Sequence, residues 1–234
     1  MTTPIVECHN LIKHYGATPA LGPINIIIPR GRIVGLLGPN GSGKTTFIKL
    51  CAGLLTPSRG EILINGYRPG AETKAHVAYL PDKNYLNDWM NVTQLVSFFA
   101  DFYTDFSRDK AMEMLYMLGI NHDQRLKSMS KGTKEKVQLI LVMSRQSDLY
   151  LLDEPIAGVD PAARDYILNT IVGNYRGNAT VVISTHLIAD VEPILEEVIF
   201  IRYGQILLQQ STDELRGQTG DSVDTHFREV FRAW

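Results

Sequence analysis

Short apolar runs, separated by stretches with helical spacing, dominate the pattern of hydrophobic and polar positions along the chain. Three of these runs are continuous, at residues 33–37, 149–152 and 180–184. Continuous apolar runs of this length are typical of strands that are buried on both faces of a parallel sheet. The pattern therefore predicts an α/β fold in which helices cover both faces of a parallel sheet.

Other apolar runs end in tight-turn signals. Residues 61–64 precede Asn65-Gly66, and two further runs surround Tyr203-Gly204. An Asn-Gly pair after an apolar run is a strong turn signal. We expect antiparallel hairpins at both places, so the sheet is mixed and an antiparallel β subdomain lies beside its parallel part.

Residues 84–127 have no strand-like run and carry apolar side chains at helical spacing. This pattern predicts a helical lobe, at about residues 84–128, inserted into a single domain that spans residues 1–210. Residues 211–234 form a short tail, in which the apolar positions predict one amphipathic helix. Those tail positions are Val223, Phe227, Val230 and Phe231.

Residues 38–45 fit the pattern G-x-x-x-x-G-K-[ST] in full, between a predicted strand and a predicted helix. Glycines let successive backbone N–H groups point at phosphate oxygens, and the helix N-terminus adds positive charge. We expect Lys44 to reach the β- and γ-phosphates and the Thr45 hydroxyl to ligate Mg²⁺. A glycine-rich turn with a chance lysine is the alternative, which the flanking strand and helix disfavour. The expected nucleotide-binding residues are Gly38, Pro39, Asn40, Gly41, Ser42, Gly43, Lys44, Thr45 and Thr46.

A second candidate motif follows the apolar run 149–152, which ends in Asp153 and Glu154. A carboxylate at the end of a strand beside a phosphate loop can hold Mg²⁺, directly or through water, and we assign this role to Asp153. Glu154 projects differently and is placed to polarise an attacking water as a general base. The alternative is a solvated acidic turn. Together with the phosphate loop, the pair predicts ATP binding with Mg²⁺ and ATP hydrolysis.

The overall composition narrows the class of partner and compartment. The 234 residues carry a formal net charge of −2, whereas nucleic-acid-binding domains usually have a basic face, so we expect no nucleic-acid partner. The two cysteines, Cys8 and Cys51, form no disulfide framework, which favours a reducing cytoplasm. The apolar runs are too short to span a bilayer, so we expect any membrane role to depend on a partner.

In their order along the chain, these motifs resemble those of the ATP-binding subunit of an ABC transporter, and the resemblance covers about residues 5–210. It implies a P-loop NTPase core that is RecA-like, with the antiparallel β subdomain and the inserted helical lobe. The further matching positions are Tyr15 at the aromatic that stacks on adenine, Asp82 at the Q-loop, Ser130, Gly132 and Thr133 at the signature, Asp160 at the D-loop and His186 at the switch histidine.

Two positions depart from the pattern of that family. The Q-loop usually offers glutamine, whereas Asp82 could reach Mg²⁺ or the attacking water through a bridging water. The signature is usually Leu-Ser-Gly-Gly-Gln, but here Lys131 replaces a glycine and Thr133 replaces the glutamine. Ser130 and Gly132 remain, and the resemblance implies that they contact the γ-phosphate. A Ser-Lys-Gly signature is similar to that of bacterial exporter-type ATPases whose membrane subunits are separate chains.

The resemblance also implies how the chain assembles and acts. Two ATP-binding subunits, identical or related, meet head to tail, and each ATP lies between the phosphate loop of one and the signature of the other. Lys44, Glu154 and His186 are then the catalytic residues, and Asp160 couples the two sites at the interface. Integral membrane subunits are the further partners, which implies a cytoplasmic location on the inner face of the cell membrane.

The sequence alone leaves several alternatives open. The chain could be a soluble ABC ATPase of cofactor assembly or a non-catalytic nucleotide-binding subunit. Taken alone, Tyr15 is typical of a surface aromatic, Ser130 of a helix N-cap and His186 of a structural histidine. The aromatic residues of the helical lobe either form a groove for a membrane subunit or fill the core of the lobe. They are Trp89, Phe98, Phe99, Phe102, Tyr103 and Phe106.

Overall fold

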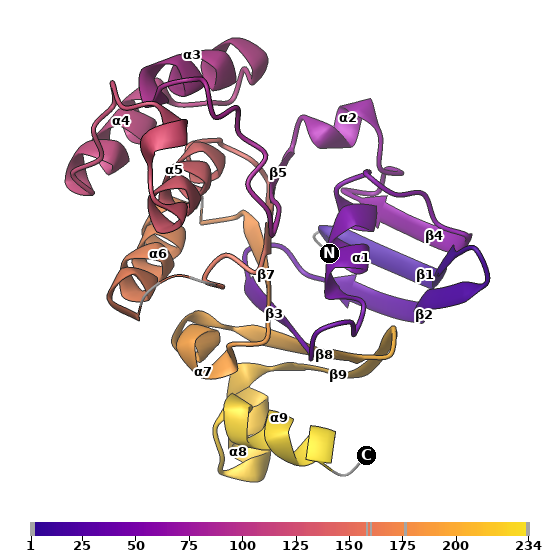
Figure 1. The fold of residues 1–234 in the computed structure, drawn as a ribbon. Helices are drawn as coiled ribbons and strands as arrows, with labels where there is room; N and C mark the ends of the chain where they lie inside the picture. The colour runs from indigo at the N-terminus through magenta and orange to yellow at the C-terminus, as the bar shows by residue number, and fades with distance from the viewer. Residues whose placement is uncertain (1–2, 158, 160, 176, 233–234) are drawn as a thin grey trace.

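The computed structural model describes residues 3–157, 159, 161–175 and 177–232, and its central layer is a six-stranded sheet (Figure 1). The six strands are β3 (Ile33–Leu37), β5 (Val77–Leu80), β6 (Leu149–Asp153), β7 (Thr180–Thr185), β8 (Glu197–Arg202) and β9 (Gln205–Ser211). They lie in the order β5-β6-β7-β3-β8-β9, and only the pair β8 and β9 is antiparallel. The three predicted buried runs are therefore neighbours in this sheet, which confirms a mixed α/β fold.

The central strands are apolar throughout because their two faces enter two different hydrophobic clusters. In β6, Leu151 packs in the cluster that contains helix α1 (Lys44–Cys51), whereas Leu152 packs in the cluster of α5 (Lys131–Met143) and α6 (Pro161–Asn174). Successive side chains of a strand point to opposite faces, so both must be apolar when both faces are covered. Each fully buried leucine contributes roughly 1.5–3 kcal/mol relative to an exposed one.

A separate three-stranded antiparallel sheet lies beside α1, as Figure 1 shows. It contains β1 (Val6–Tyr15), β2 (Thr18–Ile28) and β4 (Arg59–Ile64), in the order β2-β1-β4. The apolar pattern did not predict the long pair of β1 and β2, because three shifts in their register interrupt the alternation of inward and outward side chains. The predicted antiparallel β subdomain is nevertheless present.

One of the two predicted hairpins is wrong and the other is confirmed. The strand before Asn65-Gly66 pairs with β1, and its turn brings only Tyr67 back to a single bridge with Ile64. Pairing with β1 buries Ile62 and Ile64 in the cluster around α1, which a short local hairpin would not do. The hairpin at Tyr203-Gly204 forms as expected between β8 and β9.

Helices dominate the segment between β5 and β6, and Figure 1 shows them stacked on one side of the central sheet. Helix α3 (Val92–Phe102) begins at Asn91, whose side chain accepts a hydrogen bond from the Gln94 backbone N–H at 2.8 Å. Helix α4 (Arg108–Met117), the short helix η1 (Leu126–Ser128) and α5 follow. The described structure therefore has helices where the lobe was predicted, and the division into domains stays a prediction.

The chain ends with two helices on the far side of β8 and β9 (Figure 1). The predicted amphipathic helix is α9 (Val223–Arg232), and α8 (Thr212–Thr219) precedes it, which the apolar pattern had not indicated. The remaining short helices are α2 (Ala71–Lys74), α7 (Ile188–Val191) and η2 (Glu192–Ile194). Among the residues described, none of the helices has the length and apolar character needed to cross a bilayer.

Candidate functional site

Three parallel strands end side by side and bring the predicted site residues together. The ladder pairs Asp153 at the end of β6 with Ser184 in β7, and Leu37 at the end of β3 with Thr185 in β7. The phosphate loop leaves β3 at this edge, and α1 begins at Lys44. Residues that are more than a hundred positions apart therefore meet at one edge of the sheet.

The phosphate loop has a backbone that only glycine fits at two positions. A Cβ on Gly38 would lie 2.3 Å from the Ile201 carbonyl oxygen, which no side chain tolerates. Gly43 has a φ of 110°, and a Cβ there would lie 2.7 Å from a methyl carbon of Leu21. The loop consequently curls tightly against β8 and β2 and delivers the chain into α1.

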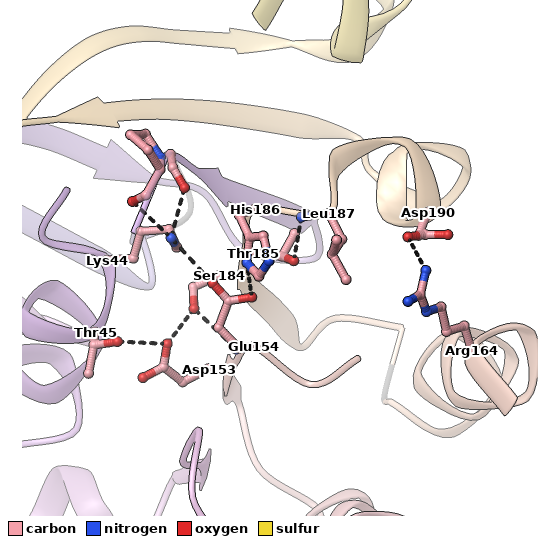
Figure 2. A network of polar contacts seen from close by, with 12 residues as sticks. Lys44, Thr45, Asp153, Glu154, Arg164, Ser184, Thr185, His186, Leu187 and Asp190 are labelled. Carbon is pink, nitrogen blue, oxygen red and sulfur yellow. Dashed lines mark hydrogen bonds and ion pairs between the residues drawn. The ribbon is translucent and has the colours of Figure 1, made fainter. Parts of the chain in front are cut away.

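Lys44 lies buried inside this curl, with 5% of its surface exposed. Its ammonium donates hydrogen bonds to the carbonyl oxygens of Gly38, at 2.8 Å, and Pro39, at 3.3 Å. The same nitrogen lies 3.3 Å from Oε1 of Glu154, as Figure 2 shows. A buried cation is costly unless it is paired and hydrogen-bonded, so these contacts fix the position of the ammonium.

Asp153 is fully buried at the end of β6. Its Oδ1 accepts hydrogen bonds from Thr45 Oγ1, at 3.2 Å, and from Ser184 Oγ, at 2.5 Å (Figure 2). Its Oδ2 has no hydrogen-bond partner within the described part of the chain. Burial raises the pKa of this carboxyl above its ordinary value. The hydrogen bonds from Ser184 and Thr45 oppose this shift, and the nearby carboxyls of Asp82 and Glu154 add to it.

Sequence reasoning missed Ser184, although its signal was visible. The apolar run 180–184 ends in this serine, and parallel neighbouring strands end at the same edge of a sheet. Its hydroxyl donates to Asp153, and its carbonyl oxygen accepts the Glu154 backbone N–H at 2.9 Å. Ser184 therefore fixes both carboxylate residues at once.

Glu154 has a left-handed backbone, with a φ of 52°, which turns its side chain away from that of Asp153. Its Oε2 lies 3.0 Å from Nδ1 of His186, and its Oε1 faces Lys44 (Figure 2). Non-glycine residues rarely adopt this φ, and such residues cluster at active sites. The carboxylate of Glu154 is thus held between a lysine and a histidine at the mouth of the site.

A groove of about 610 Å³ opens beside this cluster. One part of its wall is the phosphate loop, another is the start of β2, and a third is the turn between β8 and β9. Asp82 and Glu154 line it as well, so the groove joins the loop to the acidic residues. Its lining residues are Thr18, Pro19, Ala20, Asn40, Gly41, Ser42, Gly43, Lys44, Thr45, Thr46, Asp82, Glu154, Tyr203 and Gly204.

The other predicted site residues lie elsewhere. The described residues that line the groove do not include Tyr15, Ser130, Gly132 or Thr133. Tyr15, at the end of β1, is 49% exposed, and the Lys13 ammonium lies 5.5 Å from its ring centroid. Asp160 lies outside the described residues.

Ser130 is confirmed as the N-cap of α5. Its Oγ accepts a hydrogen bond from the Thr133 backbone N–H at 3.1 Å and lies 2.8 Å from the Thr133 hydroxyl. The next side chain, Lys131, is 81% exposed and only loosely paired with Glu135 at 3.8 Å. Ser130 and Lys131 at the N-terminus of α5 are therefore exposed, and neither is among the described residues that line the groove.

Comparison with known proteins gives a consistent result. Residues 21–157 match the family described as ABC transporter. The SkfA peptide export ATP-binding protein SkfE of Bacillus subtilis (strain 168) is 32% identical over 209 residues, which are 87% of this chain and 87% of that protein. The linearmycin resistance ATP-binding protein LnrL of the same organism is 26% identical and covers 94% of this chain and 73% of its own length.

A solved structure described as an ATP-binding subunit of an ABC transporter has a similar fold throughout. It superposes with a TM-score of 0.85 at 29% sequence identity and covers 97% of this chain and 99% of its own. The likeness therefore includes both sheets and the helical segment between β5 and β6.

Proposed function

The chain belongs to the ABC transporter family as an ATP-binding subunit, and on this premise we propose how its residues bind and hydrolyse ATP. The subunit hydrolyses ATP to ADP and phosphate and powers transport through separate membrane subunits. The names of its relatives do not favour a soluble cofactor-assembly ATPase. One observation carries the proposal for the site: Glu154 is held between Lys44 and His186 at the mouth of the phosphate groove.

ATP binds with its phosphates in the curl of the phosphate loop. The backbone N–H groups of residues 40–46 and the N-terminal end of α1 supply the positive field, and Lys44 supplies the full charge. A γ-phosphate would replace the carboxylate of Glu154 as the counter-ion of Lys44. Nucleotide binding would therefore release Glu154 from its ion pair, so that the carboxylate can act on water.

The donor atoms around Asp153 fit a magnesium ion. Asp153 Oδ2 is buried without a partner in the described structure, and a nearby cation would stabilise its ionised form. Mg²⁺ is usually held by one or two protein oxygens together with phosphates and waters. The Thr45 hydroxyl and Asp153 would hold it, with Asp82 acting through water from the groove wall. When bound, Mg²⁺ neutralises charge that develops on the phosphates.

Hydrolysis needs an oriented water and little covalent help. The carboxylate of Glu154 accepts a hydrogen bond from that water and takes up its proton as attack proceeds. His186 holds the other carboxylate oxygen and, from the end of β7, contacts the γ-phosphate. The proton thus ends on Glu154, and the phosphoryl group leaves ADP as inorganic phosphate.

The signature residues complete the site of a second subunit. Ser130 and Thr133 lie at an exposed helix N-terminus, outside the groove of their own chain. An exposed helix N-terminus that carries hydroxyl side chains is well suited to an anion. We therefore assign Ser130, Gly132 and Thr133 to the γ-phosphate of a partner subunit, identical or related, and Asp160 to the interface between them.

A second groove, of about 510 Å³, is suited to a membrane subunit. It lies next to Asp82, with Tyr79 and Pro81 on the side of the core and Phe102 and Tyr103 on the side of the lobe. Phe99, which was a candidate for such a groove, is buried in the lobe core. We propose that an amphipathic helix of an integral membrane subunit binds here, which places the chain on the cytoplasmic face of the membrane.

The catalytic assignment is tested with Glu154→Gln. The amide keeps the shape of the side chain but cannot accept the proton, so kcat should fall by about 100-fold or more while ATP still binds. ATPase activity and ATP affinity of the purified protein are measured in parallel, with Glu113→Gln on α4 as the matched control. Near-normal turnover in Glu154→Gln would remove Glu154 from the mechanism.

The membrane groove is tested with Phe102→Asp, which puts a charge into its apolar wall. Co-purification with the detergent-solubilised membrane subunit should be lost, whereas ATP binding should stay within about twofold. Tyr116→Asp is the control, because Tyr116 is an exposed aromatic of the same lobe outside this groove. Equal co-purification of both variants would contradict the docking site.

A further inference from the structure

The segment after β7 leads from His186 into the one-turn helix α7. Leu187 donates its backbone N–H to the Thr185 hydroxyl at 3.0 Å, which turns the chain at the end of the strand (Figure 2). Helix α7 then spans the four residues Ile188–Val191. A helix of one turn is not stable by itself, so contacts with other elements must hold α7 in place. The contacts that hold α7 therefore also limit where His186 can lie.

Two kinds of contact hold this helix. Its apolar side packs into the cluster of α5 and α6 through Ile188 and Val191. Its polar side carries Asp190, whose Oδ2 accepts a hydrogen bond from Nη1 of Arg164 in α6 at 2.8 Å (Figure 2). Hydrophobic packing is not directional, whereas a charge-assisted hydrogen bond favours one distance and one angle. The ion pair therefore fixes how α7 is oriented on α6.

Arg164 also reaches back to the segment that precedes its own helix. Its Nε donates to the Val159 carbonyl oxygen at 3.2 Å. Val159 is buried, and it precedes Asp160, which we assign to the interface with a partner subunit. The planar guanidinium presents its N–H donors at fixed angles, so one side chain can hold two acceptors in a set geometry. Arg164 therefore links the segment before α6 to the helix after His186.

The exposure of this link indicates that it sets positions more than it adds stability. The side chains of Arg164 and Asp190 are 24% and 34% exposed, and ion pairs that solvent reaches contribute little to stability. Position matters at His186, because its Nδ1 lies 3.0 Å from Oε2 of Glu154. A hydrogen bond of this length is lost when either atom moves away by about 1 Å. A small shift of α7 would therefore break the contact between the histidine and the general base.

We propose that Arg164 is a positioning residue for His186 and that it acts through Asp190 and α7. The link holds His186 against Glu154, and it ties this contact to the position of the segment before α6. The inference rests on the proposed roles of Glu154 and His186 in hydrolysis. Neither Arg164 nor Asp190 is among the described residues that line the phosphate groove. The link should therefore affect hydrolysis and leave ATP binding unchanged.

The test cuts the link from either end. Arg164→Leu and Asp190→Ala should each lower the rate constant of hydrolysis about tenfold, because His186 is no longer held in place, and should leave the affinity for ATP within about twofold of the wild type. Single-turnover hydrolysis of Mg-ATP and calorimetric titration with a non-hydrolysable ATP analogue measure the two quantities. Arg216→Leu is the matched control and should hydrolyse ATP like the wild type. Arg216 of α8 pairs with Glu192, just after α7, at 3.0 Å.

A double-mutant cycle distinguishes positioning of His186 from a general loss of structure. In a His186→Ala background, Arg164→Leu should change the rate constant by less than about twofold, because the residue that it positions is already gone. A further loss of about tenfold in that background would overturn the inference. A wild-type rate in Arg164→Leu would overturn it too, and so would a parallel loss of ATP affinity or an equal loss in Arg216→Leu.

Failure of the proposed hydrolysis mechanism looks different. His186→Ala alone would then hydrolyse ATP as fast as the wild type does, whatever residue occupies position 164. That result would remove His186 from the mechanism, and with it the residue that Arg164 is proposed to position.

Discussion

The edge of the sheet where β3, β6 and β7 end differs in kind from the exposed N-terminus of α5. At the sheet edge, Lys44 and Asp153 are buried, and their contacts are made within the chain. At the start of α5, Ser130 and Lys131 face solvent, and the hydroxyl of Ser130 satisfies only its own helix. Both regions carry sequence motifs of similar length. Only at the sheet edge, however, does folding of the single chain bring motif residues from distant segments together.

The difference indicates how the chemistry is divided. A buried charged cluster costs free energy that is recovered only when a ligand or a partner charge is supplied, so it is poised for ATP and Mg²⁺. An exposed helix N-terminus costs little free energy to form. Its attraction for an anion stays weak until a second surface excludes water from it. We therefore expect loss of the buried Lys44 charge at the sheet edge to alter binding, and changes at α5 to alter turnover.

The largest effect on ATP binding should come from Lys44→Ala. Losing the buried ammonium removes charge-assisted hydrogen bonds to the phosphates, and ATP affinity should fall by about 100-fold. Lys49→Ala is the matched control, because it removes a lysine from the same helix away from the phosphate groove. ATP titration by calorimetry measures both variants. An affinity within about threefold of the wild type for Lys44→Ala would contradict the assignment of the phosphate site to the sheet edge.

Ser130→Ala should separate turnover from binding. ATP binding by the subunit should stay within about twofold, whereas hydrolysis should fall about tenfold, because a donor to the partner's γ-phosphate is lost. The lost cap also destabilises α5, by about 1 kcal/mol. Ser107→Ala controls for this, since Ser107 caps α4 in the same way, accepting from the Lys110 N–H at 3.3 Å. If both variants hydrolyse ATP equally, Ser130 acts only as a cap.

Lys131→Glu should have a smaller effect, and one that depends on salt. The side chain is exposed, and reversing its charge would repel the phosphates of the partner site, so kcat should fall about threefold at low ionic strength. At about 1 M salt, screening over about 3 Å should remove most of the difference. Hydrolysis rates at several salt concentrations test this, with Lys136→Glu on the same helix as the control. A loss that does not depend on salt would indicate a steric cause.

The smallest expected effect concerns stability and pH. Burial raises the pKa of the Asp153 carboxyl above its ordinary 3.8, so the folded state holds this proton more tightly than the unfolded state does. The stability of the protein should therefore decrease as pH rises from about 3.8 through the raised pKa. Without Mg²⁺, Asp153→Asn should unfold a few degrees higher than the wild type at neutral pH, and the difference should shrink in acid. Thermal unfolding across pH measures it, and a difference that stays constant would exclude ionisation of Asp153 as its cause.

Much of the site could be predicted because its motifs are local. The phosphate loop lies between a strand and a helix that periodicity identifies, and Asp153 and Glu154 follow the last apolar residue of a strand. Strand ends of a parallel sheet meet at one edge, so the proximity of Lys44 and Asp153 follows from a coarse fold. The antiparallel partner of β4 could not be predicted, because bulges in β1 hide its alternation.

By itself, the sequence determined the buried strands β3, β6 and β7, the helical segment between β5 and β6, the phosphate-binding loop and the positions of the acidic residues, since all of these depend on periodicity and spacing within a few residues. Only the tertiary structure decided that Glu154 pairs with both Lys44 and His186, that Asp153 keeps one oxygen without a hydrogen-bond partner among the described residues, and that Tyr203 lines the groove. These features depend on contacts between segments far apart in the chain, whose geometry is set by how strands pair and pack, and no local pattern encodes it.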